Sequence, residues 1–107
     1  MKPVIIEAPQ DSIAYVGGRM TLRCRADGYP TPHLAWLRNG APTPTTFVHD
    51  ISRDGTELIF LNVTFEDAAT YKCFAQNSAG TTFASAVLTV RPGITRTPVI
   101  PTGGNYK

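Results

Sequence analysis

One stretch of this chain clearly alternates hydrophobic and polar positions with a period of two residues, and two further stretches follow the same period less strictly. Between residues 20 and 26, Met, Leu, Cys and Ala alternate with Thr and two arginines. The same period recurs over residues 71–76 and over residues 83–90. Because successive side chains of a β-strand point to opposite faces, a period of two is typical of strands. Each stretch is therefore predicted to be a strand with one face toward a core and the other toward solvent.

Shorter hydrophobic stretches lie between and before these strands. Further strands are predicted in residues 4–6, 12–16, 34–37, 47–51 and 58–63. Glycine, proline and asparagine, which favour turns, stand between them. About eight short strands at this spacing predict an all-β sandwich or barrel. From Pro92 onward the alternation is lost, so residues 1–91 are predicted to form one domain and residues 92–107 a flexible tail or a linker to a following domain.

Composition and charge exclude several classes of protein. The nine prolines and nine glycines argue against a helical bundle, because a proline inside a helix costs about 3 kcal/mol. The net charge of +2 is too small to predict nucleic-acid binding. A helix needs roughly 20 consecutive apolar residues to cross a bilayer, and the sequence contains no apolar run of nearly that length. Membrane attachment is therefore expected only through other parts of a longer protein.

The two cysteines, Cys24 and Cys73, both fall on the hydrophobic phase of their strands. Trp36 follows the first cysteine by 12 positions, and Tyr71 precedes the second by two. In two sheets packed about 10 Å apart, inward side chains come within reach of a disulfide between the sheets. A disulfide and a pair of buried thiols in a reducing cell are the two alternatives.

These residues belong to motifs that resemble the immunoglobulin superfamily, and its I-set in particular. The matching motifs, spread over residues 3–91, are Leu22-Arg23-Cys24, Gly28-Tyr29-Pro30-Thr31-Pro32, Trp36, Leu58-Ile59-Phe60, Asp67-Ala68-Ala69-Thr70-Tyr71-Lys72-Cys73 and Ala75-Gln76-Asn77-Ser78-Ala79-Gly80. The resemblance implies a two-sheet antiparallel Greek-key sandwich with sheets A-B-E-D and A'-G-F-C. It also favours a Cys24–Cys73 disulfide, with Trp36, Tyr71, Leu22 and Leu88 in the core around it, and hence an extracellular setting.

Two positions depart from the family pattern. Ala69 stands where the family usually has glycine. No arginine lies near the start of strand D to pair with Asp67, and both Arg53 and His49 are expected to be poor substitutes. His49 is instead expected to be a solvated histidine in a loop or an edge strand.

The hairpin formed by the second and third alternating stretches predicts a candidate binding face. Counted from a turn at residues 77–80, Phe74 pairs with Phe83, and both point outward because Cys73 points inward. The candidate face on the outside of the C-F-G sheet consists of Phe74, Phe83, Leu37, Val87 and Lys72. A solvated sheet face is normally polar, so an apolar patch there indicates a partner. A smaller rival patch, Ile59 and Leu61, is expected on the opposite sheet.

Two other features bear on partners and modification. Asn62-Val63-Thr64 is an acceptor sequence for N-glycosylation. Arg19, Arg23 and Arg25 share the polar face of one strand and could bind a sulfated glycan, although an ordinary solvated strand face is the plainer interpretation.

The residues predict a binding module that carries out no catalysis. Neither histidine has a cysteine or carboxylate at metal-ligand spacing, and the sequence contains no phosphate loop or nucleophile motif, so no metal, cofactor or enzyme activity is expected. The leading hypothesis is an extracellular or cell-surface adhesion or receptor module that binds a protein partner, a second copy of itself included. The alternative is an intracellular structural I-set module of a muscle or cytoskeletal scaffold.

Overall fold

The computed structural model describes residues 1–93, in which strands dominate. Their elements, in chain order, are β1 (Val4–Glu7), β2 (Ser12–Tyr15), β3 (Met20–Arg23), β4 (Arg25–Asp27), β5 (His33–Arg38), β6 (Ala41–Pro42), β7 (His49–Ile51), β8 (Glu57–Phe60), the 3-10 helix η1 (Phe65–Asp67), β9 (Ala69–Asn77) and β10 (Gly80–Arg91). The expected tail begins at Pro92, and its residues 94–107 lie outside the described part. No helix within residues 1–93 is long and apolar enough to cross a membrane.

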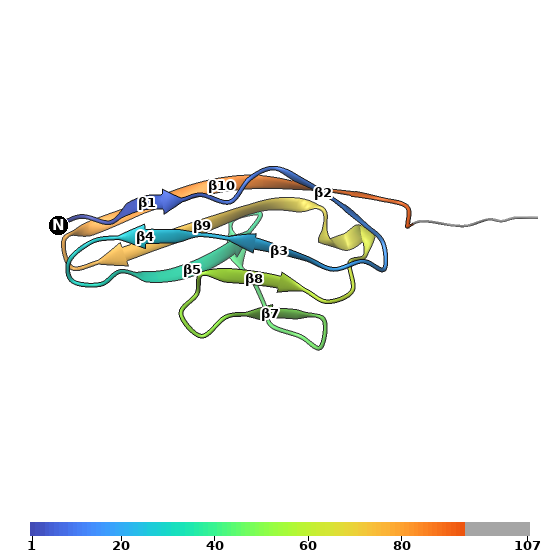
Figure 1. The fold of residues 1–107 in the computed structure, drawn as a ribbon, viewed down its shortest axis with the longest axis horizontal. Coiled ribbons are helices and arrows are strands. Elements are labelled where there is room, and N and C mark those ends of the chain that lie inside the picture. Colours follow the sequence, from blue (N-terminus) through green and yellow to red (C-terminus); the bar gives the residue numbers. More distant parts are fainter. Residues whose placement is uncertain (94–107) are drawn as a thin grey trace, which may run out of the picture.

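One layer of the sandwich is the A-B-E-D sheet that the resemblance implied. β1 pairs with β4, and β3 pairs with β8, which in turn pairs with β7. β3 and β4 lie in line as two halves of strand B, interrupted only at Cys24 (Figure 1). The Cys24 amide donates to the carbonyl oxygen of Thr56 at 2.8 Å, so strand B stays attached to the neighbouring chain across this interruption.

The second layer is a five-stranded sheet in the order β2-β10-β9-β5-β6. β2 runs parallel to β10 and supplies strand A', while β9 and β10 form the long antiparallel hairpin. The short β6 extends the sheet beyond β5, which is strand C. The hydrophobic pattern did not predict β6, because this strand is only two residues long. The predicted all-β immunoglobulin sandwich is confirmed.

The core between the layers is built around a disulfide. Cys24 and Cys73 are bonded, with their Cα atoms 6.3 Å apart, and both are fully buried. Trp36 is buried beside β9, where it lies directly opposite Cys73. Leu22, Tyr71 and Leu88 are buried in the same cluster.

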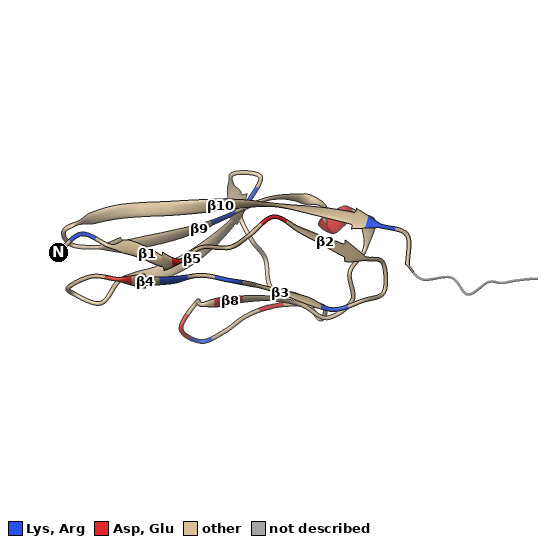
Figure 2. Cartoon of the chain, turned by 45° about the horizontal axis from the view of Figure 1, so that its top comes forward, with Lys and Arg blue, Asp and Glu red and all other residues tan. Residues whose placement is uncertain are grey.

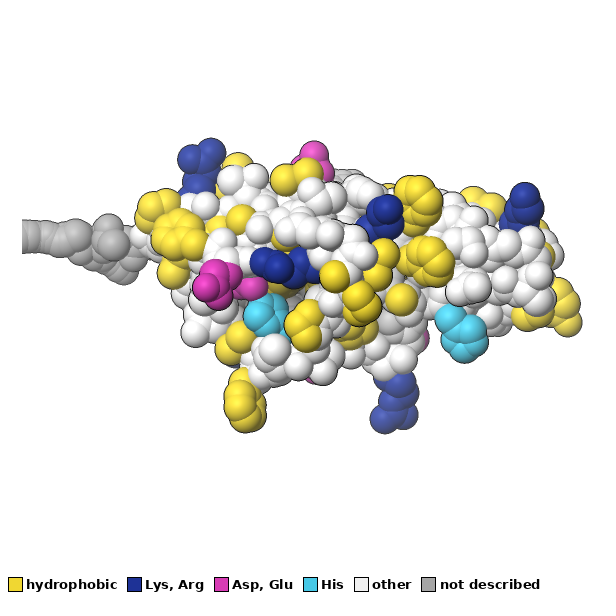
Figure 3. All heavy atoms as spheres, turned by 180° about the vertical axis from the view of Figure 1, so that it is seen from behind, with side chains coloured by type: hydrophobic (Ala, Val, Ile, Leu, Met, Phe, Trp, Pro, Cys, Tyr) yellow, Lys and Arg dark blue, Asp and Glu magenta, His cyan; other side chains and the backbone are white. Residues whose placement is uncertain are grey.

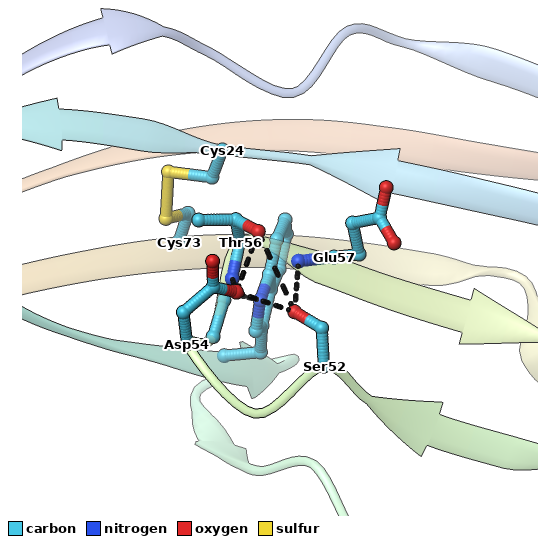
Figure 4. Close-up of a disulfide and its surroundings, with 8 residues drawn as sticks. Cys24, Ser52, Asp54, Thr56, Glu57 and Cys73 are labelled. Carbon is cyan, nitrogen blue, oxygen red and sulfur yellow. Dashed lines mark hydrogen bonds between the residues drawn. A yellow bond between two sulfur atoms is a disulfide. The ribbon is translucent and has the colours of Figure 1, made fainter.

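The turn between β7 and β8 holds the tryptophan and lies beside the disulfide (Figure 4). Asp54 Oδ1 accepts hydrogen bonds from the Thr56 amide, the Thr56 hydroxyl and the Ser52 hydroxyl. These hydrogen bonds, those from Thr56 more than the one from Ser52, hold the pKa of the Asp54 carboxyl below its ordinary value. This ordered turn presents the Gly55 carbonyl oxygen to Trp36 Nε1 at 2.8 Å.

His49 differs from its sequence-based expectation. Its Nε2 lies 2.6 Å from Asp67 Oδ1, and its Nδ1 lies 2.8 Å from the Thr46 hydroxyl. His49 begins β7, which corresponds to the start of strand D, and its side chain is only 22% exposed. The expectations of a solvated histidine and of a poor substitute for the family's arginine were therefore wrong, because His49 at the start of β7 reaches the buried carboxylate of Asp67 in η1.

Candidate partner-binding face

The register of β5, β9 and β10 brings the predicted face residues together. Phe74 lies opposite Phe83 on one side and opposite Ala35 on the other. Leu37 lies opposite Lys72. Trp36, Cys73 and Ala84 form the row between these two rows and face inward, so the side chains on either side of that row share the outer face of the sheet.

The face is largely apolar, and two of its side chains are well exposed. Phe83 is 57% exposed and Val87 is 47% exposed, whereas Phe74 and Leu37 are half-buried by their neighbours. The Lys72 Nζ lies 4.3 Å from the centroid of the Phe83 ring, a cation–π arrangement that keeps one aromatic face partly covered. Seen from behind, hydrophobic side chains gather in the middle of the molecule around a basic side chain (Figure 3).

Strand β2 extends this surface in a way that the sequence analysis missed. Ile13 lies opposite Thr89, and Tyr15 lies opposite Arg91. Ala14 between them is buried, so Ile13 and Tyr15 point outward, and they are 54% and 48% exposed. The alternation from Ser12 to Tyr15 indicated a strand. Which of its side chains point outward, however, depends on the parallel pairing of this short strand with β10.

The charges of this sheet are all positive. Its five strands contain Arg38, Lys72 and Arg91, and none of the chain's eight acidic residues. Asp11 lies at the margin, where its Oδ1 accepts a hydrogen bond from the Val87 amide at 2.8 Å. We call the outward side chains Ile13, Tyr15, Leu37, Lys72, Phe74, Phe83 and Val87 the GFC face.

The arginine stripe is where the sequence placed it, but acidic side chains lie opposite two of its members. Arg23 lies opposite Glu57, with 3.4 Å between Nη2 and Oε2, and Arg25 lies opposite Glu7. Figure 2 shows the basic positions of β3 and β4 flanked by acidic ones on β1 and β8. Arg19 is exposed beyond them. The neighbouring carboxylates weaken the attraction of this stripe for a sulfated glycan.

A hollow of about 220 Å³ is lined by residues of β5, the loop after β6, β7, η1 and β9. His49 and Asp67 line it, together with Arg38, which donates to the Glu66 carbonyl oxygen. Tyr71 also lines it and donates to the Asp67 carbonyl oxygen at 2.7 Å. These polar groups are bonded to one another, which indicates a structural role. No group of three or more potential metal ligands was found within residues 1–93.

Comparisons with known proteins show to which protein family this chain belongs. The family model described as "Immunoglobulin domain" matches residues 2–77. The chain belongs to the immunoglobulin superfamily. Its I-set character agrees with its similarity to titin domains: in a crystal structure of the titin M10–obscurin-like 1 immunoglobulin complex, one chain aligns with a TM-score of 0.79 at 27% identity, covering 88% of this chain and 98% of that one.

Among curated proteins, the chain resembles single segments of much larger molecules. It is 40% identical to the peroxidasin homolog pxn-2 of Caenorhabditis elegans over 88% of this chain and 7% of that protein. It is 41% identical to the neuronal cell adhesion molecule of Mus musculus over 82% of this chain and 7% of that protein. The chain therefore spans less than a tenth of the length of these relatives, and the similarity concerns a generic immunoglobulin module.

Proposed function

We propose that this domain is an extracellular recognition module that binds a partner protein through the GFC face and performs no chemistry itself. The observation that carries this proposal is the opposed pair Phe74 and Phe83 on the outside of a sheet. Solvated sheet faces are normally polar, and contiguous exposed apolar surface marks contact sites. Here that surface continues from strand β5 to the edge strand β2.

The charge of the face favours an acidic partner over a second copy of the same domain. Lys72 lies at the centre of the apolar surface, and none of the eight acidic residues lies on the five strands that carry it. Two copies meeting face to face would bring like charges together, which is unfavourable in a desolvated contact. A partner that offers apolar side chains around a carboxylate would complement Lys72.

The disulfide and the adhesion-type relative support a location outside the cell or on its surface. Disulfides persist in oxidising compartments and are rare in the cytosol. The second candidate, an intracellular structural module, is supported by the similarity to titin domains. Titration of free thiols in the protein isolated from its own compartment under non-reducing conditions separates the two. No titratable thiol is expected for the extracellular module, and two are expected for the intracellular one.

The arrangement of the chain supports a role as one module, residues 1–91, within a longer protein. The amino terminus and the end of β10 lie at opposite ends of the sandwich (Figure 1). Modules built this way can be joined end to end, with residues 92–107 as the linker to a following domain. The GFC face would then remain accessible along the side of the module.

The proposal is tested by replacing both phenylalanines of the pair with serine. Loss of partner binding by a variant that keeps its fold supports the GFC face as the contact surface. Unchanged binding would place the contact elsewhere on the domain.

A further inference from the structure

Asn62 occupies an exposed position two residues after the end of β8. Phe60 and Val63 on either side of the Leu61–Asn62 pair are buried, whereas Leu61 and Asn62 are exposed. The Val63 amide donates to the Gly18 carbonyl oxygen, and the Gly17 amide donates to the Val63 carbonyl oxygen. The chain is thus held at Val63 while the Asn62 side chain is directed to solvent.

The other asparagines within the described part are used to build the fold. Asn39 Oδ1 accepts a hydrogen bond from the Thr70 amide. Asn77 Nδ2 donates to the carbonyl oxygens of Met1 and Pro30. The Asn62 amide makes no hydrogen bond within residues 1–93. It is also the one asparagine of the whole sequence that is followed by any residue but proline and then by Ser or Thr.

We propose that Asn62 is an N-glycosylation site, and that its glycan covers the outside of β8 and leaves the GFC face open. This inference rests on the secretory setting proposed above. The reaction joins Asn62 Nδ2 to C1 of an oligosaccharide carried on a lipid diphosphate. The bond from C1 to the diphosphate oxygen breaks, the lipid diphosphate leaves with its electron pair, and the amide nitrogen loses one proton.

The position of Asn62 determines which surface the sugar covers. Leu61, 38% exposed, precedes it, and Ile59 points outward from β8, where it lies opposite Thr21 and Asp50. These two residues form the smaller apolar patch on the A-B-E-D sheet. A glycan on Asn62 would cover that patch, while the GFC face belongs to the opposite layer.

The test uses the full 107-residue chain directed into the secretory pathway of animal cells, with translation into microsomes as a second readout. The wild type and Thr64→Ser, which keeps the acceptor sequence, should carry one oligosaccharide that peptide N-glycosidase removes. Thr64→Ala and Asn62→Gln should run at the unmodified mass. An unmodified wild type, in a preparation that modifies a control glycoprotein, would overturn the proposal, as would a modified Thr64→Ala variant.

The placement of the glycan has its own readout. Binding of the domain to cells that carry its partner should be the same for the glycosylated wild type and for Asn62→Gln. Markedly stronger binding by Asn62→Gln would put the glycan over the contact surface and contradict its placement. An unmodified Asn62 leaves the GFC face testable by its own variants, so the two proposals can fail separately.

Discussion

The ammonium group of Lys72 lies over the ring of Phe83, 4.3 Å from its centroid, in the middle of the GFC face. Lys72 is one residue from Cys73 and directly opposite Leu37, so the rigid core of the sandwich fixes its position. The face therefore presents a positive charge surrounded by apolar side chains, and a partner that binds as proposed has to complement both.

The role of Lys72 predicts a difference between two substitutions. Lys72→Arg keeps a cation that stacks on aromatic rings and should bind the partner within a few-fold of the wild type. Lys72→Glu places a carboxylate against the partner's acidic group and should weaken binding about tenfold or more, equivalent to at least about 1.4 kcal/mol. Equilibrium binding at low and moderate salt measures both. Equal binding by the two variants would argue against an acidic partner.

Gly55 is predicted to be required by the turn that holds Trp36. Its φ is +79°, and an added Cβ would lie 2.8 Å from the Leu34 carbonyl oxygen. Gly55→Ala should therefore cost about 1–3 kcal/mol through backbone strain, and more from the clash. Gly40→Ala is the matched control, because Gly40 has a φ of +87° but open space around its Cβ position. Chemical denaturation should show a larger loss of unfolding free energy for Gly55→Ala than for Gly40→Ala. Equal losses would mean that the close approach to the Leu34 carbonyl oxygen costs no stability.

The pairing of His49 with Asp67 predicts that an arginine can replace the histidine but an alanine cannot. His49→Ala leaves the buried Asp67 Oδ1 without its side-chain donor and should cost about 1–3 kcal/mol of unfolding free energy. His49→Arg supplies donors at the position where the family usually has arginine and should recover most of that loss. Urea unfolding at neutral pH gives both values. A His49→Ala domain as stable as the wild type would make the pair dispensable.

Tyr71 predicts a loss of stability in alkaline solution. Burial raises the pKa of the Tyr71 hydroxyl above its ordinary value of 10.0. Tyrosine in the unfolded chain loses its proton near pH 10, whereas folded Tyr71 keeps it, so the unfolded state binds fewer protons above that pH. The free energy of unfolding should then fall as pH rises above about 10 and be unaffected by this group at pH 7. The free energy of unfolding of Tyr71→Phe should fall less steeply over the same pH range. Parallel curves for the variant and the wild type would contradict the raised pKa of Tyr71.

The hairpin register could be predicted from the pattern within two long strands, and the disulfide was favoured by the family resemblance. The turn at residues 77–80 and the period of two placed Phe74 opposite Phe83, and the structure confirms that pairing. The spacing of Cys24, Trp36 and Cys73 carried the family resemblance, and the disulfide is present. In the hairpin, the turn and the period of two together determine the position of every residue along both strands.

Features that depend on contacts between short segments were not predictable in this way. The family pattern pointed to Asp67 as the partner of a residue near the start of strand D, but it gave no reason to expect that His49 reaches Asp67 at 2.6 Å in place of the usual arginine. Ile13 and Tyr15 join the GFC face through the parallel pairing of a four-residue strand with β10. The outer-face position of Asn62 likewise depends on the buried neighbour Val63, and its glycosylation stays a prediction.

The most direct test of the central claim compares two double variants of the same domain in a multivalent form that binds animal cells. Phe74→Ser with Phe83→Ser changes the GFC face, and Ile59→Ser with Leu61→Ser changes the outside of the opposite sheet as the matched control. Circular dichroism and thermal unfolding establish that both remain folded. If the GFC face is the contact surface, cell binding is lost for the first variant and retained for the second. Retained binding by the Phe74/Phe83 variant, or loss by the control alone, would contradict it.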